Sequence, residues 1–248
     1  MLDINKRYAR HIFLATHCFG EKAQAALQKI KTKYKDIVDE HLEIVAPPKT
    51  YTTESGYEIT KYGNYVFLLM IVTDDADKFA SAIDTFIAQF KGKGLIGHTM
   101  VLDLHYSSHA AEYVKRWERY NVVSAEYDSI EDSLQSLILF IEENLDVHGL
   151  ISFDWNDFKW MLPLSVHLSC GTILPKAGHP LAESFPIPVE RVKGLILGLE
   201  LSSLNEEISL KETNDLNDFI ECFPEDLECK WSIPVKLGES KVRYIAMI

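Results

Sequence analysis

Residues 149–158 read Gly-Leu-Ile-Ser-Phe-Asp-Trp-Asn-Asp-Phe, and this stretch decides the fold. It places Asp154 and Asp157 three residues apart, at the point where one helical pattern ends and the next begins. Two closely spaced carboxylates in a turn between helices have the form of a catalytic loop. Asp154 and Asp157 are therefore the candidate catalytic residues.

A long amphipathic helix is predicted directly before this acidic loop. Asp128 and Glu131 supply a capping-box-like start. The apolar side chains that follow fall at helical spacing: Ile130, Leu134, Leu137, Ile138, Ile141 and Leu145. The pattern predicts one helix over residues 128–147.

The N-terminal part alternates strand-like and helix-like segments, which is typical of an α/β sheet. The expected strands are residues 11–16, 63–72, 99–104 and 121–124. The expected helices are residues 23–34, 79–90 and 105–118. The apolar run at 63–72 is continuous, as in a buried strand of a parallel sheet. We therefore predict a Rossmann-like parallel sheet.

The long helix, the Gly-Leu-Ile turn and the two spaced aspartates together resemble FtsZ, the bacterial homologue of tubulin. In that family a central helix leads into a Gly-Leu-Ile-Asn-x-Asp-Phe-x-Asp loop, which contacts the nucleotide held by the next subunit of a filament. Asp154 and Asp157 match the two aspartates of that loop. Ser152 replaces its Asn, and Trp155 replaces its Phe.

The resemblance continues to the end of the chain and covers about half of it. Residues 192–197 resemble the strand that opens the second half of the family's C-terminal domain, and residues 210–223 resemble the helix after it. Residues 230–232 and 241–246 resemble the two closing antiparallel strands. The resemblance implies a Rossmann-like domain over residues 1–127, a central helix over 128–148 and a smaller α+β domain over 149–248.

Three features depart from the family pattern. Ser202 and Ser203 stand where a glycine pair is usual, and the segment between residues 171 and 192 is short. Pro163 follows the acidic loop, and a proline inside a helix costs roughly 3 kcal/mol. We therefore expect the helix after the loop to be kinked or broken at Pro163.

The resemblance places a nucleotide pocket at the loops after the first two strands, where a doubly wound sheet binds its ligands. Phosphates are held there by glycine-rich turns next to helix N-termini. The first loop, residues 16–22, has one glycine, and the second, residues 73–78, reads Thr-Asp-Asp-Ala-Asp-Lys in place of the family's glycine-rich signature. Thr16, Gly20 and Thr73 are the remaining candidates for nucleotide binding.

Asp74, Asp75 and Asp77 are expected to cap the helix that follows them. Carboxylates in this position oppose the binding of a phosphate, because two like unit charges 4 Å apart repel by about 4 kcal/mol at an effective dielectric constant of 20. Alternatively, the three carboxylates hold a Mg²⁺ ion that bridges to phosphates. We expect no cofactor, with GTP and magnesium as the alternative.

Two interpretations of the acidic loop remain open. In the structural one, Asp154 is a helix N-cap and Asp157 a first-turn acid. In the one implied by the resemblance, both carboxylates complete a hydrolytic site across a subunit boundary by positioning the attacking water, while the nucleotide stays on the neighbour.

Composition excludes several classes of partner. A formal net charge of −12 argues against nucleic acid or an anionic membrane surface as the main partner. No apolar run reaches the roughly 18–20 residues that span a bilayer, and no signal peptide is evident. The sequence ends at Ile248, directly after its last expected strand, so tethering through a flexible tail is not expected. We expect a cytoplasmic protein.

The remaining candidates are weaker. His105 and His109 lie four apart on an expected helix and could share a metal, but no third ligand has a diagnostic spacing. The four cysteines show no paired spacing and are expected to be reduced, small, buried residues. Trp155, Trp160 and Trp231 are expected to anchor the core or an interface.

The sequence thus predicts a divergent FtsZ/tubulin-like cytoskeletal protein, a pseudo-GTPase that contacts a second copy or another FtsZ-like protein longitudinally. It would offer Asp154 and Asp157 to the nucleotide on its neighbour. The first alternative is an active, filament-forming GTPase of cell division or membrane remodelling. The second is a metal-dependent hydrolase that uses the histidine pair or Asp74, Asp75 and Asp77.

Overall fold

The structure is a computed structural model that describes most of the chain. The described residues are 11–33, 50–52, 58–60, 65–91, 95–105, 119–123, 129–144, 150–152, 154–161, 164–165, 167–176, 178–234 and 238–248. The chain forms two compact units, Met1–Arg119 and Tyr120–Ile248. In the first unit, β2 (Thr50–Thr52) and β3 (Glu58–Thr60) pair as a small antiparallel sheet of their own.

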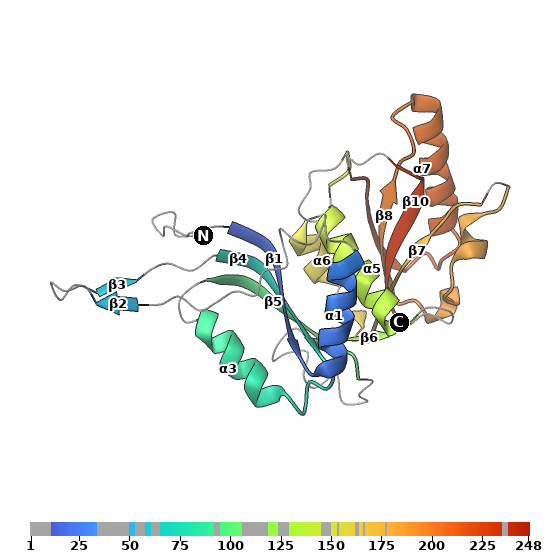
Figure 1. The fold of residues 1–248 in the computed structure, drawn as a ribbon. Helices are drawn as coiled ribbons and strands as arrows, with labels where there is room; N and C mark the ends of the chain where they lie inside the picture. Colours follow the sequence, from blue (N-terminus) through green and yellow to red (C-terminus); the bar gives the residue numbers. More distant parts are fainter. Residues whose placement is uncertain are drawn as a thin grey trace. The chain divides into compact units, whose positions relative to one another are not determined.

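The first unit is built on a parallel sheet whose strands are shown in Figure 1. Strand β4 (Tyr65–Thr73) lies between β1 (His11–Phe19) and β5 (Ile96–Asp103) and is parallel to both. Helix α1 (Glu21–Lys33) follows β1, and α3 (Ala80–Lys91) joins β4 to β5. This confirms the predicted Rossmann-like parallel sheet.

Burial explains why these segments form strands and helices. Strand β4 is buried at every position except one, which accounts for its unbroken apolar sequence. On one side of the sheet, Ile83 and Phe90 of α3 join Leu69, Ile71 and Val101 in a single apolar cluster. This core fixes α3 against the sheet and so positions the loops at the carboxyl ends of the strands.

The second unit has a mixed sheet. Its strands lie in the order β6 (Arg119–Val123), β7 (His167–Ile173), β10 (Lys241–Met247), β8 (Gly194–Glu200) and β9 (Glu228–Ser232). The central strand β10 is antiparallel to both neighbours, β7 and β8. The outer pairs, β6 with β7 and β8 with β9, are parallel.

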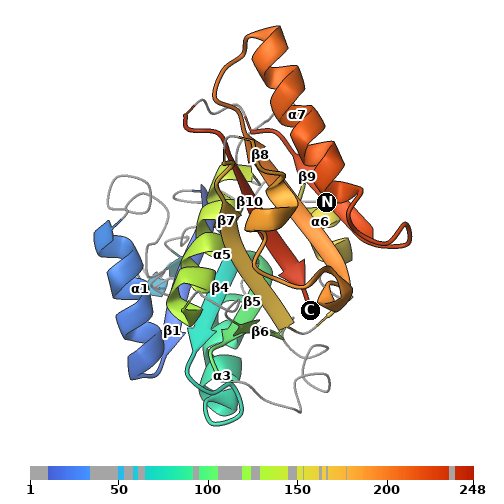
Figure 2. The same cartoon turned by 90° about the vertical axis from the view of Figure 1, so that its right-hand side faces the viewer.

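In the described part of the second unit, three α-helices and two short 3₁₀-helices accompany this sheet. They are α5 (Ile130–Asn144), α6 (Trp155–Met161), η2 (Leu181–Ser184), η3 (Val189–Arg191) and α7 (Glu206–Ile220). Helix α5 lies along β7 (Figure 2), and α6 ends two residues before Pro163. A mixed α/β second unit with a long helix before the acidic loop therefore agrees with the expected fold.

Polar contacts hold α5 to this sheet. The hydroxyl of Ser133 on α5 donates to the carbonyl oxygen of Cys170 at 3.2 Å and accepts from the Cys170 N–H at 2.8 Å. The guanidinium of Arg243 on β10 forms a two-point ion pair with the Glu143 carboxylate, and both side chains are largely buried. A third polar contact lies at the end of α5, where Oδ1 of the buried Asn144 accepts a hydrogen bond from the Ser232 hydroxyl at 2.7 Å. Together these contacts fix the register of the helix on the strands.

One expectation about these elements was wrong in detail. Reciprocal capping at the start of α5 joins Ser129 and Asp132, not Asp128 and Glu131: the Asp132 N–H donates to the Ser129 hydroxyl at 3.1 Å, and the Ser129 hydroxyl donates to the Asp132 carboxylate at 2.8 Å. A capping box joins a serine at the N-cap to an acidic residue three positions later, and Ser129 with Asp132 is the pair that meets both conditions.

The two closing strands run antiparallel to each other, as expected. Strand β8 lies between them, antiparallel to β10 and parallel to β9. Of the expected helix over residues 105–118, His105 alone is described, and it lies in a bend directly after β5. Residues 106–118, with His109, lie outside the described residues.

Candidate functional site: two acidic loops

The first expected loop, residues 16–22, is mostly strand. Strand β1 continues through Phe19, and Thr16 lies within it with 3% of its surface exposed. Gly20 is the one residue between β1 and α1, and its φ of +105° is a conformation that glycine adopts readily. The expectation of a long phosphate loop after Thr16 was therefore wrong.

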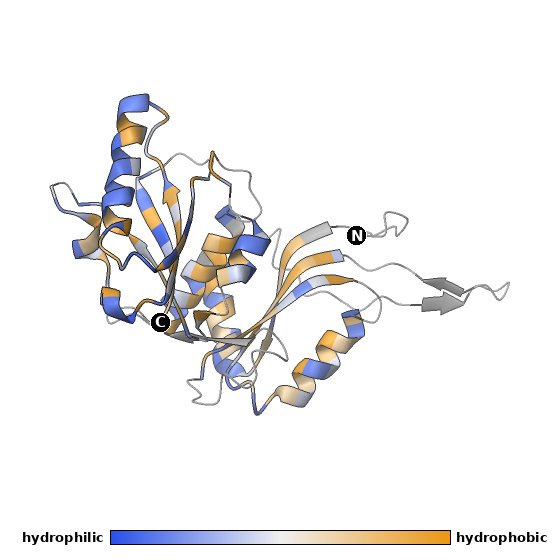
Figure 3. Ribbon diagram, turned by 180° about the vertical axis from the view of Figure 1, so that it is seen from behind, coloured by the Kyte–Doolittle hydropathy of each residue, from blue (hydrophilic) through white to orange (hydrophobic). Residues whose placement is uncertain are grey.

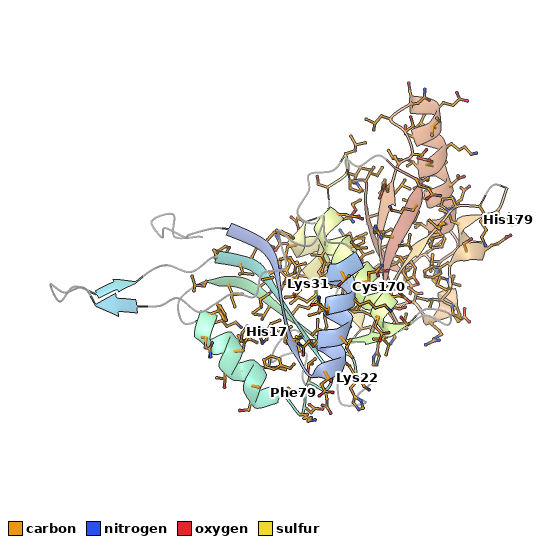
Figure 4. All side chains as sticks on the ribbon, in the orientation of Figure 1. His17, Lys22, Lys31, Phe79, Cys170 and His179 are labelled. Carbon is orange, nitrogen blue, oxygen red and sulfur yellow. The ribbon has the colours of Figure 1, made fainter. Side chains whose placement is uncertain are left out.

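The side chains of His17 and Phe19 explain why the strand is longer. His17 extends from β1 towards α3 (Figure 4), where its ring stacks on that of Phe86 with centroids 3.9 Å apart. Phe19 packs edge-on against His17 at 4.9 Å. Burial lowers the pKa of His17, since the charged form loses hydration. These contacts keep the segment in the sheet.

The backbone amides at the start of α1 are occupied by a carboxylate of the same chain. Asp74, in the loop after β4, accepts hydrogen bonds from the N–H of Ala23 at 2.6 Å and the N–H of Lys22 at 3.1 Å. Figure 4 labels Lys22 at this end of α1. A Cβ on Gly20 would lie 2.3 Å from Cγ of Asp74, so the glycine makes the approach possible.

We expected Asp74 to cap the helix that follows it, and this was wrong, because it caps α1 instead. Parallel strands end at one edge of the sheet, so the loop after β4 adjoins the helix that follows β1. Asp74 occupies the place at the helix N-terminus that a phosphate would need.

Thr73 and Asp75 accept hydrogen bonds from backbone amides of the second loop itself. The carboxylate of Asp75 accepts from the N–H of Asp77 at 3.0 Å and of Lys78 at 3.1 Å. The hydroxyl of Thr73, which is buried at the end of β4, accepts from the Asp75 N–H at 3.3 Å. Asp75 thus caps the turn before α3, as expected of this group of acids.

Asp103, at the end of β5, was missed in the sequence. It is fully buried, and its carboxylate accepts from the N–H of Ala76 at 3.2 Å and from that of His105 at 2.9 Å. An aspartate directly after an apolar strand run was a usable signal. Asp103 ties the second loop to the third strand and adds negative charge to the same edge.

The arrangement at this edge does not resemble a metal centre. Among the described residues, no group of three or more His, Cys, Asp or Glu side chains could hold a metal ion. The carboxylates of Asp74 and Asp75 point at backbone amides of different segments. His109 lies outside the described residues, so the expected histidine pair is described only at His105.

The second acidic loop forms a capping box at the start of α6. Oδ1 of Asp154 accepts from the N–H of Asn156 at 2.7 Å and of Asp157 at 2.9 Å. In return, Oδ2 of Asp157 accepts from the Asp154 N–H at 3.3 Å. Asp154 is exposed and Asp157 is partly exposed. The structural role considered for both residues is therefore present in the fold.

A cation and several apolar side chains lie near this loop. Nζ of Lys230 on β9 is 3.5 Å from Oδ1 of Asp157. Ile151 pairs with Ile233 through backbone hydrogen bonds. Leu150 is 58% exposed and Trp160, on α6, is 72% exposed. No local pattern points to Lys230, because β9 reaches the loop only in the folded unit.

The tryptophans and cysteines occupy mixed environments. Trp155 is buried, and Trp231 packs against the core of the second unit. Burial raises the pKa of the Cys170 thiol, and it raises that of Cys229 to about 11. Cys170 is buried, Cys18 and Cys229 are partly exposed, and Cys222 is exposed. The expectation that all four cysteines are buried was therefore correct only for Cys170.

No helix in the described part of the chain is long and apolar enough to cross a membrane.

No family model matches the chain, and no curated protein matches it in sequence. Solved structures match it in fold. CetZ from Methanosaeta thermophila aligns over 96% of this chain and 86% of its own, with a TM-score of 0.55 and 10% identity. A point mutant of FtsZ from M. jannaschii aligns over 96% of this chain and 91% of its own, with a TM-score of 0.52 and 8% identity. The chain therefore has a fold similar to that of these two proteins.

A third match has a lower score. TubZ from Bacillus thuringiensis serovar israelensis, in a GTPγS-form protofilament, aligns over 92% of this chain and 67% of its own, with a TM-score of 0.46 and 12% identity.

Proposed function

We propose that this chain, which has the FtsZ/tubulin fold, is a pseudo-GTPase assembly protein that contacts an FtsZ-like neighbour through its acidic loop. It would hold no nucleotide of its own. It would instead present Asp154 and Asp157 to the nucleotide bound by that neighbour. The observation that carries this proposal is the Asp74 carboxylate on the first amides of α1.

Electrostatics supports the loss of nucleotide binding. A phosphate at the start of α1 would have to displace Asp74 from two amides, and hydrogen bonds to a charged group contribute about 1.5–3 kcal/mol each. The displaced carboxylate would stay close to the phosphate, together with Asp75 and the buried Asp103. Unit charges 4 Å apart repel by about 4 kcal/mol at an effective dielectric constant of 20, equivalent to roughly a thousandfold in affinity.

The acidic loop supports the second part of the proposal. Asp154 is exposed while it caps α6, so its carboxylate can meet a neighbour without any loss of structure. Leu150 and Trp160 expose large apolar surfaces in the loop and on α6, and such surfaces favour protein contacts. This combination fits a surface that docks on a partner and places charge there.

The first experiment is isothermal calorimetry of the purified chain with GTP and Mg²⁺. We expect no heat of binding at micromolar concentrations of nucleotide. Asp74→Ala should restore weak nucleotide binding, because it removes both the charge and the carboxylate that occupies the amides at the start of α1. Asp77→Ala is the matched control, since it makes the same change at an exposed position of the same loop and should leave binding absent.

The second experiment mixes the chain with a purified FtsZ protein that has intact glycine loops, and follows GTP hydrolysis and sedimentation of polymer. We expect the chain to sediment with the polymer and to change its GTPase rate. Micromolar binding of GTP by the unmodified chain, with hydrolysis at high concentration, would refute the proposal and support the active GTPase instead. No effect on FtsZ and no self-association would refute the assembly role.

A further inference from the structure

The second unit has a groove that is separate from the acidic loop. It has a volume of about 790 Å³ and lies between α7 and the segment of residues 175–182. The floor is apolar and consists of residues at most 5% exposed: Leu181, Leu199, Phe219 and Val242. We call this feature the α7 groove. Its floor belongs to the main core cluster of the unit, so the groove has rigid support.

Apolar side chains also line the open rim of the groove. Ile208 on α7 lines it and is 42% exposed. Pro175 and Pro180 line the facing segment. Leu204 and Leu210, which flank Ile208 in sequence, are also exposed but do not line the groove. Exposed apolar residues that gather at a groove indicate a binding surface, whereas single ones are ordinary.

The α7 side of the groove is strongly acidic. Its acidic lining residues are Glu207, Glu212, Asp215 and Asp218. Residues 206–228 contain nine acids and one lysine, Lys211. Helix α7 is accordingly mostly hydrophilic on its outer surface in Figure 3. Two lysines also line the groove, Lys211 on α7 and Lys176 on the facing segment, so the acids outnumber the lysines by four to two. On the facing segment, His179 is paired with Glu183 at 2.8 Å (Figure 4).

Charge decides between the possible occupants. A second copy of this chain carries a net charge of −12, so it would be repelled by this rim. A segment with one apolar face and a basic flank would satisfy both the floor and the rim, in the manner of a helix bound in a groove. We infer that the α7 groove binds a basic amphipathic helix of a partner protein. This inference is independent of the nucleotide and acidic-loop proposal.

The test uses a fluorescent synthetic peptide of about 18 residues, five helical turns, with leucines on one face and lysines on the other. Binding is measured by fluorescence anisotropy at low and high salt. We expect affinity to fall as salt rises, since charges at the rim are screened. A scrambled peptide of the same composition and a leucine–glutamate peptide should bind at least about tenfold more weakly, a difference of roughly 1.4 kcal/mol.

Matched variants locate the binding site. Asp215→Lys with Asp218→Lys reverses charge in the groove, and Glu225→Lys with Asp226→Lys makes the same change in the exposed turn outside it. We expect the groove pair to weaken binding about tenfold or more and the turn pair to change it less than about threefold. All four positions are exposed, and circular dichroism checks that each variant is folded.

A second pair of variants tests the apolar part. Ile208→Ser removes a rim residue of the groove, and Leu204→Ser removes a more exposed leucine that does not line it. Only Ile208→Ser should weaken peptide binding. Two outcomes would overturn the inference: the groove pair and the turn pair of charge reversals weaken peptide binding equally, or the scrambled peptide binds as well as the amphipathic one. Either outcome would mean that the peptide is held by general charge attraction and not by the groove. A dimer in sedimentation equilibrium that Ile208→Ser abolishes would overturn it by assigning the groove to a second copy.

Discussion

Asp154 and Asp157 hold each other in place through two hydrogen bonds. The N–H of Asp157 donates to Oδ1 of Asp154 at 2.9 Å, and the N–H of Asp154 donates to Oδ2 of Asp157 at 3.3 Å. Capping uses the carboxylate oxygens but not the negative charge itself, because a neutral Asn caps a helix about as well as Asp. A substitution at Asp154 can therefore separate the structural role from a role in hydrolysis.

Asp154→Ala should lower the free energy of unfolding by about 0.5–2 kcal/mol, because α6 loses its N-cap. Asp154→Asn should change it by a few tenths of a kcal/mol, and urea denaturation measures both. If the charge acts on a neighbour's nucleotide, Asp154→Asn also loses the effect on the GTPase rate of an added FtsZ. If Asp154→Asn keeps the full effect on that rate, the charge of Asp154 has no role in hydrolysis and only the capping role remains.

Gly20→Ala should destabilise the first unit through two causes, a φ of +105° that alanine rarely adopts and a clash with Asp74. Asp74→Gly removes the partner in the clash. In a double-mutant cycle, the double variant should therefore be more stable than the sum of the single effects predicts, by about 0.5–3 kcal/mol. Additive effects, measured by urea denaturation, would mean that the close approach of Asp74 to Gly20 is absent.

Glu143→Ala should lower the free energy of unfolding by about 3–5 kcal/mol, because Arg243 is left as an uncompensated, largely buried charge. Replacing both residues, as Glu143→Leu with Arg243→Met, should cost much less. Glu183→Ala removes the acid of the exposed His179–Glu183 pair and should cost less than about 1 kcal/mol. Similar losses for the buried and the exposed pair would contradict the burial of Arg243.

The stability of the first unit should depend on pH through His17. Burial lowers its pKa in the folded chain below the ordinary value of 6.5, so the unfolded chain binds the proton more readily. The contribution of neutral His17 is thus complete above about pH 6.5 and is lost as the pH falls through the folded pKa. His17→Phe, which keeps an aromatic ring against Phe86, should reduce the decline in stability between pH 7.5 and 5.

Chemical denaturation at several pH values measures this effect. The pKa of His167 is also lowered, by burial and by the charge of Lys193, so part of the decline should remain in the His17 variant. His179→Gln, at an exposed position, serves as control and should keep the full decline. An unchanged pH profile in His17→Phe would show that the His17 ring is not buried.

Cys222 should react first with a maleimide. It is exposed, whereas burial raises the pKa of the thiols of Cys18 and Cys170 and raises that of Cys229 to about 11. A high pKa leaves little of the reactive thiolate at neutral pH. Mass spectrometry of the native chain should find a single rapid label, and Cys222→Ser should abolish it. Rapid labelling of Cys170 would contradict its burial.

Much of the fold follows from short-range patterns in the sequence. The continuous apolar run identifies β4, because a strand buried on both faces needs apolar residues at successive positions. The helical spacing identifies α3 and α5, because a helix buried on one face needs apolar residues every three to four positions. The extension of β1 through Phe19 did not follow, because it depends on His17 stacking on Phe86 of a helix distant in sequence. The cap of α5 was misplaced by one residue, since two neighbouring pairs both fit a capping pattern.

The candidate sites divide in the same way. Local patterns are enough to show that acids replace glycines in the second loop and that Asp154 and Asp157 start a helix. The cap of Asp74 on α1 and the pair of Lys230 with Asp157 depend instead on long-range packing. The Asp74 contact spans 51 residues, and it exists because parallel strands bring their carboxyl ends to one edge, which places the loop of one strand against the helix of another.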